Sequence, residues 1–243
     1  MKTISILKIA FTIISCLLIS TTQAQWKKIK GNGNKVSIMR STPEYSGIKC
    51  AGSFDYILVK GKEGSLTLEG DENLLDFIIT EVKGDILKVK VKDGVSLKTR
   101  NGSSIKITIP FESINKVALA GSGDLYSKNV INTSSLDVSL AGSGDITLDI
   151  KTESVESALS GSGDITLKGT TENLESKVAG SGDFHGFELD ANNTEVYVAG
   201  SGDAKVVGNK TLKARVSGSG DIAYHGSPEK EDTKVSGSGS ISN

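Results

Sequence analysis

Six aspartates recur at a nearly constant interval in the second half of the chain, and carboxylates in such a row are potential ligands for a divalent cation. They are Asp124, Asp145, Asp164, Asp183, Asp203 and Asp221. Each closes a copy of the motif Gly-Ser-Gly-Asp, and successive copies lie 18 to 21 residues apart. A period of this size predicts stacked structural repeats, which would place neighbouring carboxylates roughly 5 Å apart.

Two interpretations of this Asp column are open. A calcium ion between the coils would offset a repulsion of about 1 kcal/mol per neighbouring pair, as in the calcium-binding nonapeptide repeats. Alternatively, each Asp accepts hydrogen bonds from the N–H groups of its own tight turn. One carboxylate and one serine per coil supply few of the roughly six to eight oxygens that calcium takes. We therefore predict a structural column, with no metal and no cofactor.

The same motif carries a second column of polar side chains, the serines. They are Ser122, Ser143, Ser162, Ser181, Ser201, Ser219 and Ser238. A nucleophilic serine needs an activating base, and none is in register, so these hydroxyls are predicted to form a hydrogen-bonded ladder. His185 and His225 lie at different offsets from their corners and have no second ligand at metal-like spacing. Both are predicted to be exposed strand or loop residues.

Some β-helices are polysaccharide lyases or hydrolases, so an enzyme of this type is a further interpretation. Hydrolysis requires two carboxylates that flank a cleft at a defined separation. Here the acids repeat uniformly along one edge. The repeats are also so similar in length that none has a long loop that could form the side of a cleft. We therefore predict no catalytic residue and no enzymatic activity.

The elements that position these columns are short strands on either side of each Gly-rich corner. Apolar residues stand two positions before the first glycine and directly after the Asp, for example Val178 and Phe184 around Asp183. Polar residues alternate with them, which predicts strands with one buried face. Equivalent strands of successive repeats would pair in parallel. The predicted fold is all-β, a right-handed parallel β-helix of ~19-residue coils.

Three segments are predicted along the chain. Residues 1–24 have a basic start, an apolar run from Ile9 to Ile19 and Ala24 before the cut, which indicates a signal peptide. Cys16 offers the alternative of an acylated lipoprotein. Residues 25–114 form a less regular N-terminal β region or cap, and 115–243 form the regular β-helix with Gly-Ser-Gly-Asp corners. The strands expected in the cap are 47–51, 54–59, 65–68, 77–82, 86–91 and 105–109.

Composition excludes several partner classes. The formal net charge of −1 becomes about −3 once Lys2 and Lys8 leave with the signal peptide, which does not suit nucleic acid or an anionic membrane surface. No later segment is long and apolar enough to span a bilayer. Aromatic residues make up only 5% of the chain, which argues against a platform of stacked rings for sugars. Cys50, the only thiol after residue 24, is predicted to be a small buried residue.

Several motifs together resemble a known family. They are Phe54-Asp55-Tyr56-Ile57-Leu58-Val59, Asn73-Leu74 with Thr80-Glu81-Val82, Gly84-Asp85-Ile86-Leu87-Lys88-Val89, Ile107-Thr108-Ile109-Pro110 and the serial corners. From about Tyr45 to Gly226 the sequence is similar to the putative auto-transporter adhesin "head GIN" domain, a domain of unknown function common in secreted Bacteroidetes proteins. The resemblance implies an exported β-helical domain and supplies no catalytic residues.

The sequence as a whole predicts an exported, non-catalytic β-helix of the cell envelope. It would act in binding, adhesion or scaffolding, with an extended protein or glycan as its partner. The expected location is the periplasm, the outer cell surface or the medium. Two alternatives are a calcium-binding Asp ladder and a polysaccharide-active enzyme.

Overall fold

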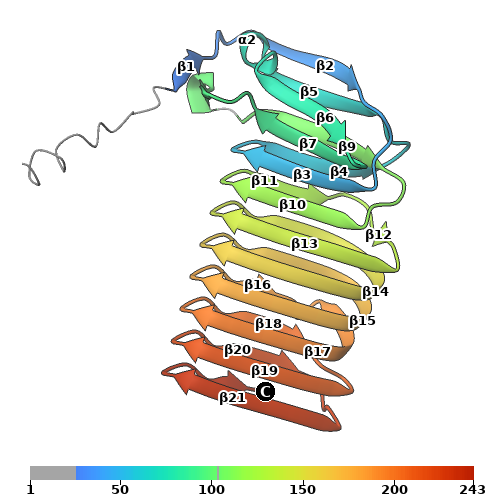
Figure 1. Cartoon of the computed structure of the whole chain (residues 1–243), viewed down its shortest axis with the longest axis vertical. Coiled ribbons are helices and arrows are strands. Elements are labelled where there is room, and N and C mark those ends of the chain that lie inside the picture. The colour runs from blue at the N-terminus through green and yellow to red at the C-terminus, as the bar shows by residue number, and fades with distance from the viewer. Residues whose placement is uncertain (1–25, 103) are drawn as a thin grey trace, which may run out of the picture.

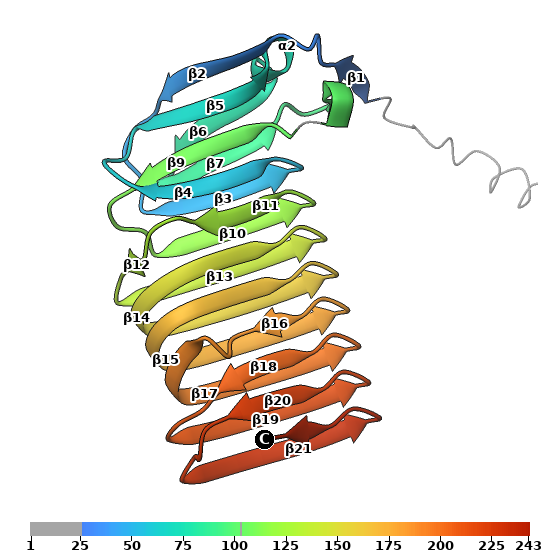
Figure 2. The ribbon, with the colours of Figure 1, turned by 180° about the vertical axis from the view of Figure 1, so that it is seen from behind.

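The computed structural model describes residues 26–102 and 104–243, and it is a right-handed parallel β-helix (Figures 1 and 2). The predicted signal peptide and Cys16 lie outside these residues. Two parallel sheets face each other and are joined by Gly-rich corners at one edge and by polar bends at the other. Within the described ranges, no helix is long and apolar enough to cross a membrane.

We call the sheet whose arrows run to the left in Figure 1 the front sheet. Its strands, in spatial order, are β7 (Ile86–Val91), β3 (Gly47–Gly52), β10 (Lys116–Gly121), β13 (Ser135–Gly142), the second halves of β14 (Ile146–Gly161) and β15 (Ile165–Gly180), β17 (Leu189–Gly200), β19 (Thr211–Gly218) and β21 (Lys230–Gly237).

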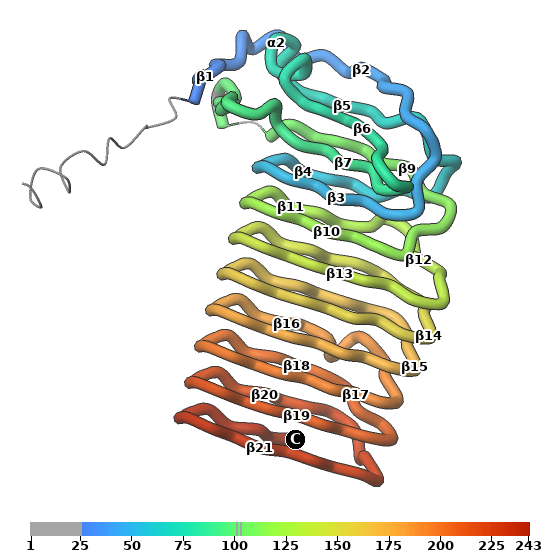
Figure 3. The backbone as a smooth tube through the Cα atoms, in the orientation of Figure 1, coloured from blue at the N-terminus to red at the C-terminus, as the bar shows by residue number. Residues whose placement is uncertain are grey.

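The back sheet follows the same order of coils. It contains β9 (Lys106–Phe111), β4 (Asp55–Lys60), β11 (Asp124–Ser127), the first halves of β14 and β15, β16 (Phe184–His185), β18 (Ala204–Val207), β20 (Ile222–His225) and β22 (Ile241–Ser242). Strands β14 and β15 continue through the bend into both sheets, and short β12 (Ile131–Asn132) pairs with β14 there. The tube in Figure 3 follows one flattened coil after another.

The predicted apolar columns form the core between the sheets. Ile165, Leu159 and Phe184 are at most 3% exposed, and Leu167 and Val178 are buried with them. The columns weaken only in the last coil, where Val235 is 41% exposed. One inward column was missed, because serine and alanine interrupt its hydrophobic pattern. Its members are Val117, Val138, Ser157, Ser176, Val196 and Ala214, all fully buried.

Both glycines of each corner are required by the close stacking of coils. The first, such as Gly161, has φ +132°, a conformation that side chains rarely adopt. The second, such as Gly163, has no unusual φ, but a Cβ there would lie 1.9 Å from the carbonyl oxygen of Gly144 in the preceding coil. Its neighbour Ser162 instead donates its N–H to the carbonyl of Gly142 at 2.8 Å. Backbone contact between corners therefore selects glycine at both positions.

A cap of antiparallel strands covers the first coil. Strands β5 (Ser65–Asp71) and β2 (Lys35–Ser41) extend the back sheet beyond β9, and β6 (Ile78–Lys83) extends the front sheet beyond β7. The short helix α2 (Glu72–Leu75) connects the two sides, β1 (Lys27–Lys30) pairs with β8 (Val95–Lys98), and the turn η1 (Arg100–Gly102) follows. The six cap strands expected from the sequence are confirmed, whereas β1, β2, β8 and α2 were not expected. The division at 114/115 stays a prediction.

Buried polar contacts hold the cap together. The fully buried Asp71 accepts the backbone N–H of Arg100 at 3.0 Å and pairs with Lys35 at 3.1 Å. The N–H of Arg100 and the ammonium of Lys35 lower the pKa of the Asp71 carboxyl. Arg40 donates to the carbonyl oxygens of Leu75 at the end of α2 and of Ile78 at the start of β6. Cys50 is 2% exposed, as predicted, and burial raises the pKa of its thiol.

Candidate binding face and the aspartate ladder

The six aspartates form a continuous ladder along the corner edge. In every coil the Oδ1 atom accepts the backbone N–H of the corresponding Asp in the next coil, at 2.9 Å for Asp145 to Asp164 and 2.8 Å for Asp183 to Asp203. The ladder ends where Asp221 accepts both the N–H and the hydroxyl of Ser240. Our expectation that each Asp serves its own turn was therefore wrong in one respect, because the donor belongs to the following coil.

The stack of corners begins one coil before the aspartate ladder does. The corner Gly52-Ser53-Phe54-Asp55 pairs in register with Gly121–Asp124. The two corners are thus equivalent in the stack, although Phe54 occupies the place of the second glycine. The Phe54 carbonyl accepts the N–H of Asp124 at 3.1 Å, so backbone pairing replaces the carboxylate contact at this step.

The serine column does not form the predicted hydroxyl ladder. In the part of the chain that the structure describes, the hydroxyls from Ser122 to Ser219 point to solvent without a hydrogen-bond partner, and only their N–H groups bond between coils. The histidines are separated from each other. His225 stacks on Phe187 with ring centroids 3.9 Å apart, and the Nε2 atom of His185 lies 3.6 Å from Oδ2 of Asp164. The prediction that neither histidine meets a second potential ligand was therefore wrong for His185.

The outward face of the front sheet has an open depression of about 700 Å³ near the cap. Its floor, which we call the alanine floor, consists of Ala118, Ala120, Ser139, Ala141, Ala158, Ser160 and Ala179. Strands β10, β13, β14 and β15 supply these residues, because their outward positions nearest the corner carry only small side chains.

Lysines surround the alanine floor. They are Lys49, Lys88, Lys90, Lys116 and Lys177, which we call the lysine rim. Lys90 pairs with Asp93 at 2.8 Å, Lys177 with Glu175 at 2.6 Å, and Lys116 with Asp137. Lys49 forms no ion pair with any described residue. The rim thus leaves positive charge beside an apolar surface.

A second depression, of about 510 Å³, follows on the same face towards the last coils. Outward carboxylates and ammonium groups line it, including Glu175, Glu195 and Lys213. The hydroxyl of Tyr197 donates to Glu195 at 2.8 Å, and Lys213 lies 3.0 Å from the same carboxylate and 5.4 Å from the Tyr197 ring centroid. These hydrogen bonds lower the pKa of the Glu195 carboxyl.

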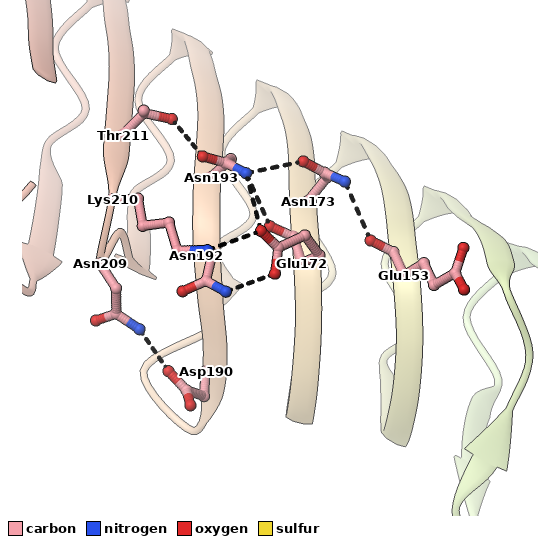
Figure 4. A network of polar contacts seen from close by, with 9 residues as sticks. All are labelled: Glu153, Glu172, Asn173, Asp190, Asn192, Asn193, Asn209, Lys210 and Thr211. Atoms are coloured by element: carbon pink, nitrogen blue, oxygen red, sulfur yellow. Dashed lines mark hydrogen bonds and ion pairs between the residues drawn. The ribbon is translucent and has the colours of Figure 1, made fainter.

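An amide network borders this second depression at the bend (Figure 4). Asn193 donates to Oδ1 of Asn173 at 3.1 Å, and Thr211 donates to Oδ1 of Asn193 at 3.0 Å. In the adjacent row, Asn192 and Lys210 bind the carboxylate of Glu172 at 2.5 and 3.1 Å. Hydrogen bonds from these two residues lower the pKa of the Glu172 carboxyl. Asn173 in turn donates to the carbonyl oxygen of Glu153 at 3.2 Å, so the network joins four successive coils into a regular polar edge.

Two acids of this region, Glu172 and Glu195, have pKa shifts opposite to the one that a general acid in glycoside hydrolysis needs. A hydrolase needs one carboxyl group held protonated near neutral pH, which calls for a raised pKa. The pKa values of Glu172 and Glu195 are shifted the opposite way, because both carboxylates accept hydrogen bonds from amide, hydroxyl or ammonium donors. The front face therefore presents a small, mostly apolar surface with lysines near the cap and a charged, hydrogen-bonding surface towards the last coils.

Comparison with known proteins agrees with this architecture. Residues 44–228 match the family described as "Putative auto-transporter adhesin, head GIN domain". No curated protein matches the chain. A putative adhesin from Bacteroides fragilis NCTC 9343 is similar in structure, with TM-score 0.82 and 25% identity over 88% of this chain and 99% of that chain.

Two proteins from Parabacteroides distasonis ATCC 8503 are also similar in structure. One is described as a putative lipid binding protein, with TM-score 0.73 and 28% identity over 89% of this chain and 99% of that chain. The other, a putative adhesin, has TM-score 0.69 and 22% identity over the same shares and speaks only to the fold. Since the family match covers most of the chain, this protein belongs to the auto-transporter adhesin head GIN domain family.

Proposed function

We propose that the protein is an exported, non-catalytic binding module of the cell envelope, which holds an extended partner along its front face. The observation that carries this proposal is the continuity of that face. Two open depressions lie one after the other along the front face, over parallel strands of equal spacing. An elongated ligand can contact equivalent positions in successive coils, as in other repeat proteins with extended binding surfaces.

The chemistry of the face indicates the partner class. Amide, hydroxyl and carboxylate groups around Asn173, Asn193 and Glu195 can exchange hydrogen bonds with glycan hydroxyls or a peptide backbone. The lysine rim favours anionic groups at the cap end. The partner is thus an extended protein or glycan of the envelope, and membership of an adhesin-like family supports this class. The signal-peptide pattern supports export to the periplasm, the cell surface or the medium.

A binding assay with front-face and back-face variants tests the proposal. Envelope polysaccharide and envelope protein fractions from the source bacterium are presented separately to residues 25–243 immobilised on a biosensor. Ala141→Glu places a charge in the centre of the alanine floor, and Thr147→Glu places the same charge on the exposed back face of the same coil.

We expect Ala141→Glu to weaken binding at least ten-fold and Thr147→Glu to leave it unchanged. Equal effects of the two variants would reject the front face as the binding surface. Release of reducing ends or unsaturated sugars from the polysaccharide fraction would instead show an enzyme.

A second candidate function follows from the alanine floor itself. An apolar floor beside ammonium groups suits an anionic amphiphile, with acyl chain on the floor and head group at Lys49. A structural relative with 28% identity is described as a putative lipid binding protein, which favours the same chemistry. Co-sedimentation with phosphatidylglycerol vesicles, but not with phosphatidylcholine vesicles, would support this candidate if Lys49→Gln reduces it. Binding only to the polysaccharide or protein fraction would exclude it.

A further inference from the structure

One histidine lies against the aspartate ladder. Asp164, Asp183 and His185 each offer one ligand atom, and the three atoms lie within 4.8 Å of one another. The Nε2 atom of His185 is 3.6 Å from Oδ2 of Asp164. All three side chains are partly exposed, so an ion can reach them from solvent.

The β-helix fixes these groups through backbone pairing. His185 follows Asp183 by two residues, so both side chains leave the strand on the same outward side. Asp164 lies one coil earlier, and its Oδ1 atom is held by the N–H of Asp183 at 2.9 Å. The Oδ1 atom of Asp183 is held in the same way by the N–H of Asp203 at 2.8 Å. The ladder thus orients both carboxylates and leaves the second oxygen of each available.

No other described coil offers this combination. The residues that pair in the same column as His185 are Thr108, Ile57, Tyr126, Thr147, Thr166, Lys205, Ala223 and Ser242. None of these side chains supplies an imidazole. Lys205 is the charged neighbour of His185 in this column, and its exposed side chain can turn to solvent. The arrangement is therefore a single site and not a property of the repeat.

We propose that Asp164, Asp183 and His185 bind one divalent transition-metal ion of the zinc class, with water completing its coordination. Zn–N and Zn–O distances of about 2.0–2.2 Å place neighbouring ligand atoms of a tetrahedral site about 3.4 Å apart, close to the observed 3.6 Å. Imidazole nitrogen with carboxylate oxygen suits zinc, nickel or copper, whereas calcium takes oxygen ligands. The bound ion links two coils across the back of the corner edge.

Isothermal titration of metal-free protein with zinc chloride tests this site. We use residues 25–243 without a purification tag and compare the wild type with His185→Thr, which installs the residue that Thr166 supplies in the preceding coil. We expect one zinc ion per chain and at least a ten-fold loss of affinity in the variant. His225→Thr removes the other histidine and is expected to leave zinc binding unchanged. Calcium chloride is expected to give no binding at this site.

A gain-of-site variant makes the test independent of any loss of folding. Thr147 occupies the His185 position in the coil that holds Asp145, beneath Asp124. Thr147→His is expected to raise the stoichiometry from one zinc ion to two. The proposal is overturned if the wild type binds no zinc, if His185→Thr binds as tightly as the wild type, or if His225→Thr causes the same loss. An unchanged melting midpoint of each metal-free variant establishes that the coils are intact.

Discussion

The Oδ1 atom of Asp145 lies 2.9 Å from the backbone nitrogen of Asp164, one coil further along the β-helix. The same contact recurs down the corner edge as far as Asp221 and Ser240. Each carboxylate therefore meets a backbone donor next to the like charge that follows it. Charge-assisted hydrogen bonds of this kind are stronger than neutral ones, so they offset the repulsion between stacked carboxylates.

Removal of one step of the ladder is expected to destabilise the fold moderately. Asp145→Ala leaves the N–H of Asp164 without its acceptor, and we expect a loss of about 1–2 kcal/mol in the free energy of unfolding, because the site is partly exposed. Asp149→Ala removes an exposed carboxylate outside the ladder and is expected to cost under about 0.5 kcal/mol. Urea denaturation of both variants measures the difference. Equal losses would mean that the ladder bonds contribute nothing beyond surface charge.

The fold is expected to be independent of calcium. The ladder oxygens accept backbone N–H groups, and one coil offers few of the further oxygens that calcium needs. The thermal midpoint of EDTA-dialysed protein should change by less than about 2 °C on addition of millimolar calcium. A rise of several degrees, abolished by Asp164→Asn combined with Asp183→Asn, would instead establish a calcium ladder.

Two glycine variants separate stacking from backbone conformation. Gly163→Ala places a Cβ 1.9 Å from the Gly144 oxygen at an ordinary φ, and we expect a loss of about 3 kcal/mol or more. Gly84→Ala meets no atom within 4 Å but stands at φ +56°, which we expect to cost only about 1 kcal/mol. Denaturant midpoints of the two variants should therefore differ clearly. A loss at Gly163 as small as that at Gly84 would show that the stacked corners relax to accept a methyl group.

Inward and outward positions of one strand should differ sharply in energetic importance. Ile165→Ala leaves a cavity in the core and is expected to cost roughly 2–5 kcal/mol. Lys177→Ala removes a side chain that is 51% exposed and paired with Glu175, and is expected to cost under about 0.5 kcal/mol. Comparable losses in chemical denaturation would mean that the in–out register is wrong.

The free energy of unfolding is expected to fall at acidic pH because of Asp71 in the cap. The lowered pKa of Asp71 means that its ionised form stabilises the folded state above the ordinary carboxyl pKa, and that this contribution is lost as the pH falls below it. Asp71→Asn should therefore be less stable than the wild type at pH 7, with a difference that shrinks below about pH 4. Urea unfolding between pH 7 and pH 3 measures it. A difference that does not change with pH would assign the loss to packing instead.

The regular coils were predictable because the same corner motif recurs once in every coil. The period fixes parallel pairing, and residues such as Ile165 and Val178 follow from alternation about each corner. The burial of Ser157 and Ser176 was not predicted, because small polar residues give no hydrophobic signal in the sequence. His185 could have been found by placing it in the register of the repeat, two residues after Asp183, instead of searching for ligand spacing along the chain.

The cap was predictable only as a set of strands. Its strands were expected from the local alternation of apolar and polar residues. The local sequence does not determine, however, that β5 pairs antiparallel with β9 while β4 pairs parallel with it. Pairing between distant segments depends on the complete cap, and β2 and the short strand β8 have weak apolar patterns. The front-face depressions likewise depend on which side chains of successive coils adjoin, so a single repeat does not reveal them.

The order in which the coils stack differs between the capped end and the rest of the β-helix. The coil of β3 and β4 comes before the coil of β7 and β9 in the chain. In space, however, it lies between the coil of β7 and β9 and the coil of β10 and β11, so the order of coils at the capped end differs from their order in the sequence. Below it, each coil contacts only its neighbours in sequence order. Duplicating one unit there would lengthen the protein by about 4.8 Å, the spacing of paired strands. The number of coils thus sets the length of the β-helix, and evolution can change this length without changing the cap.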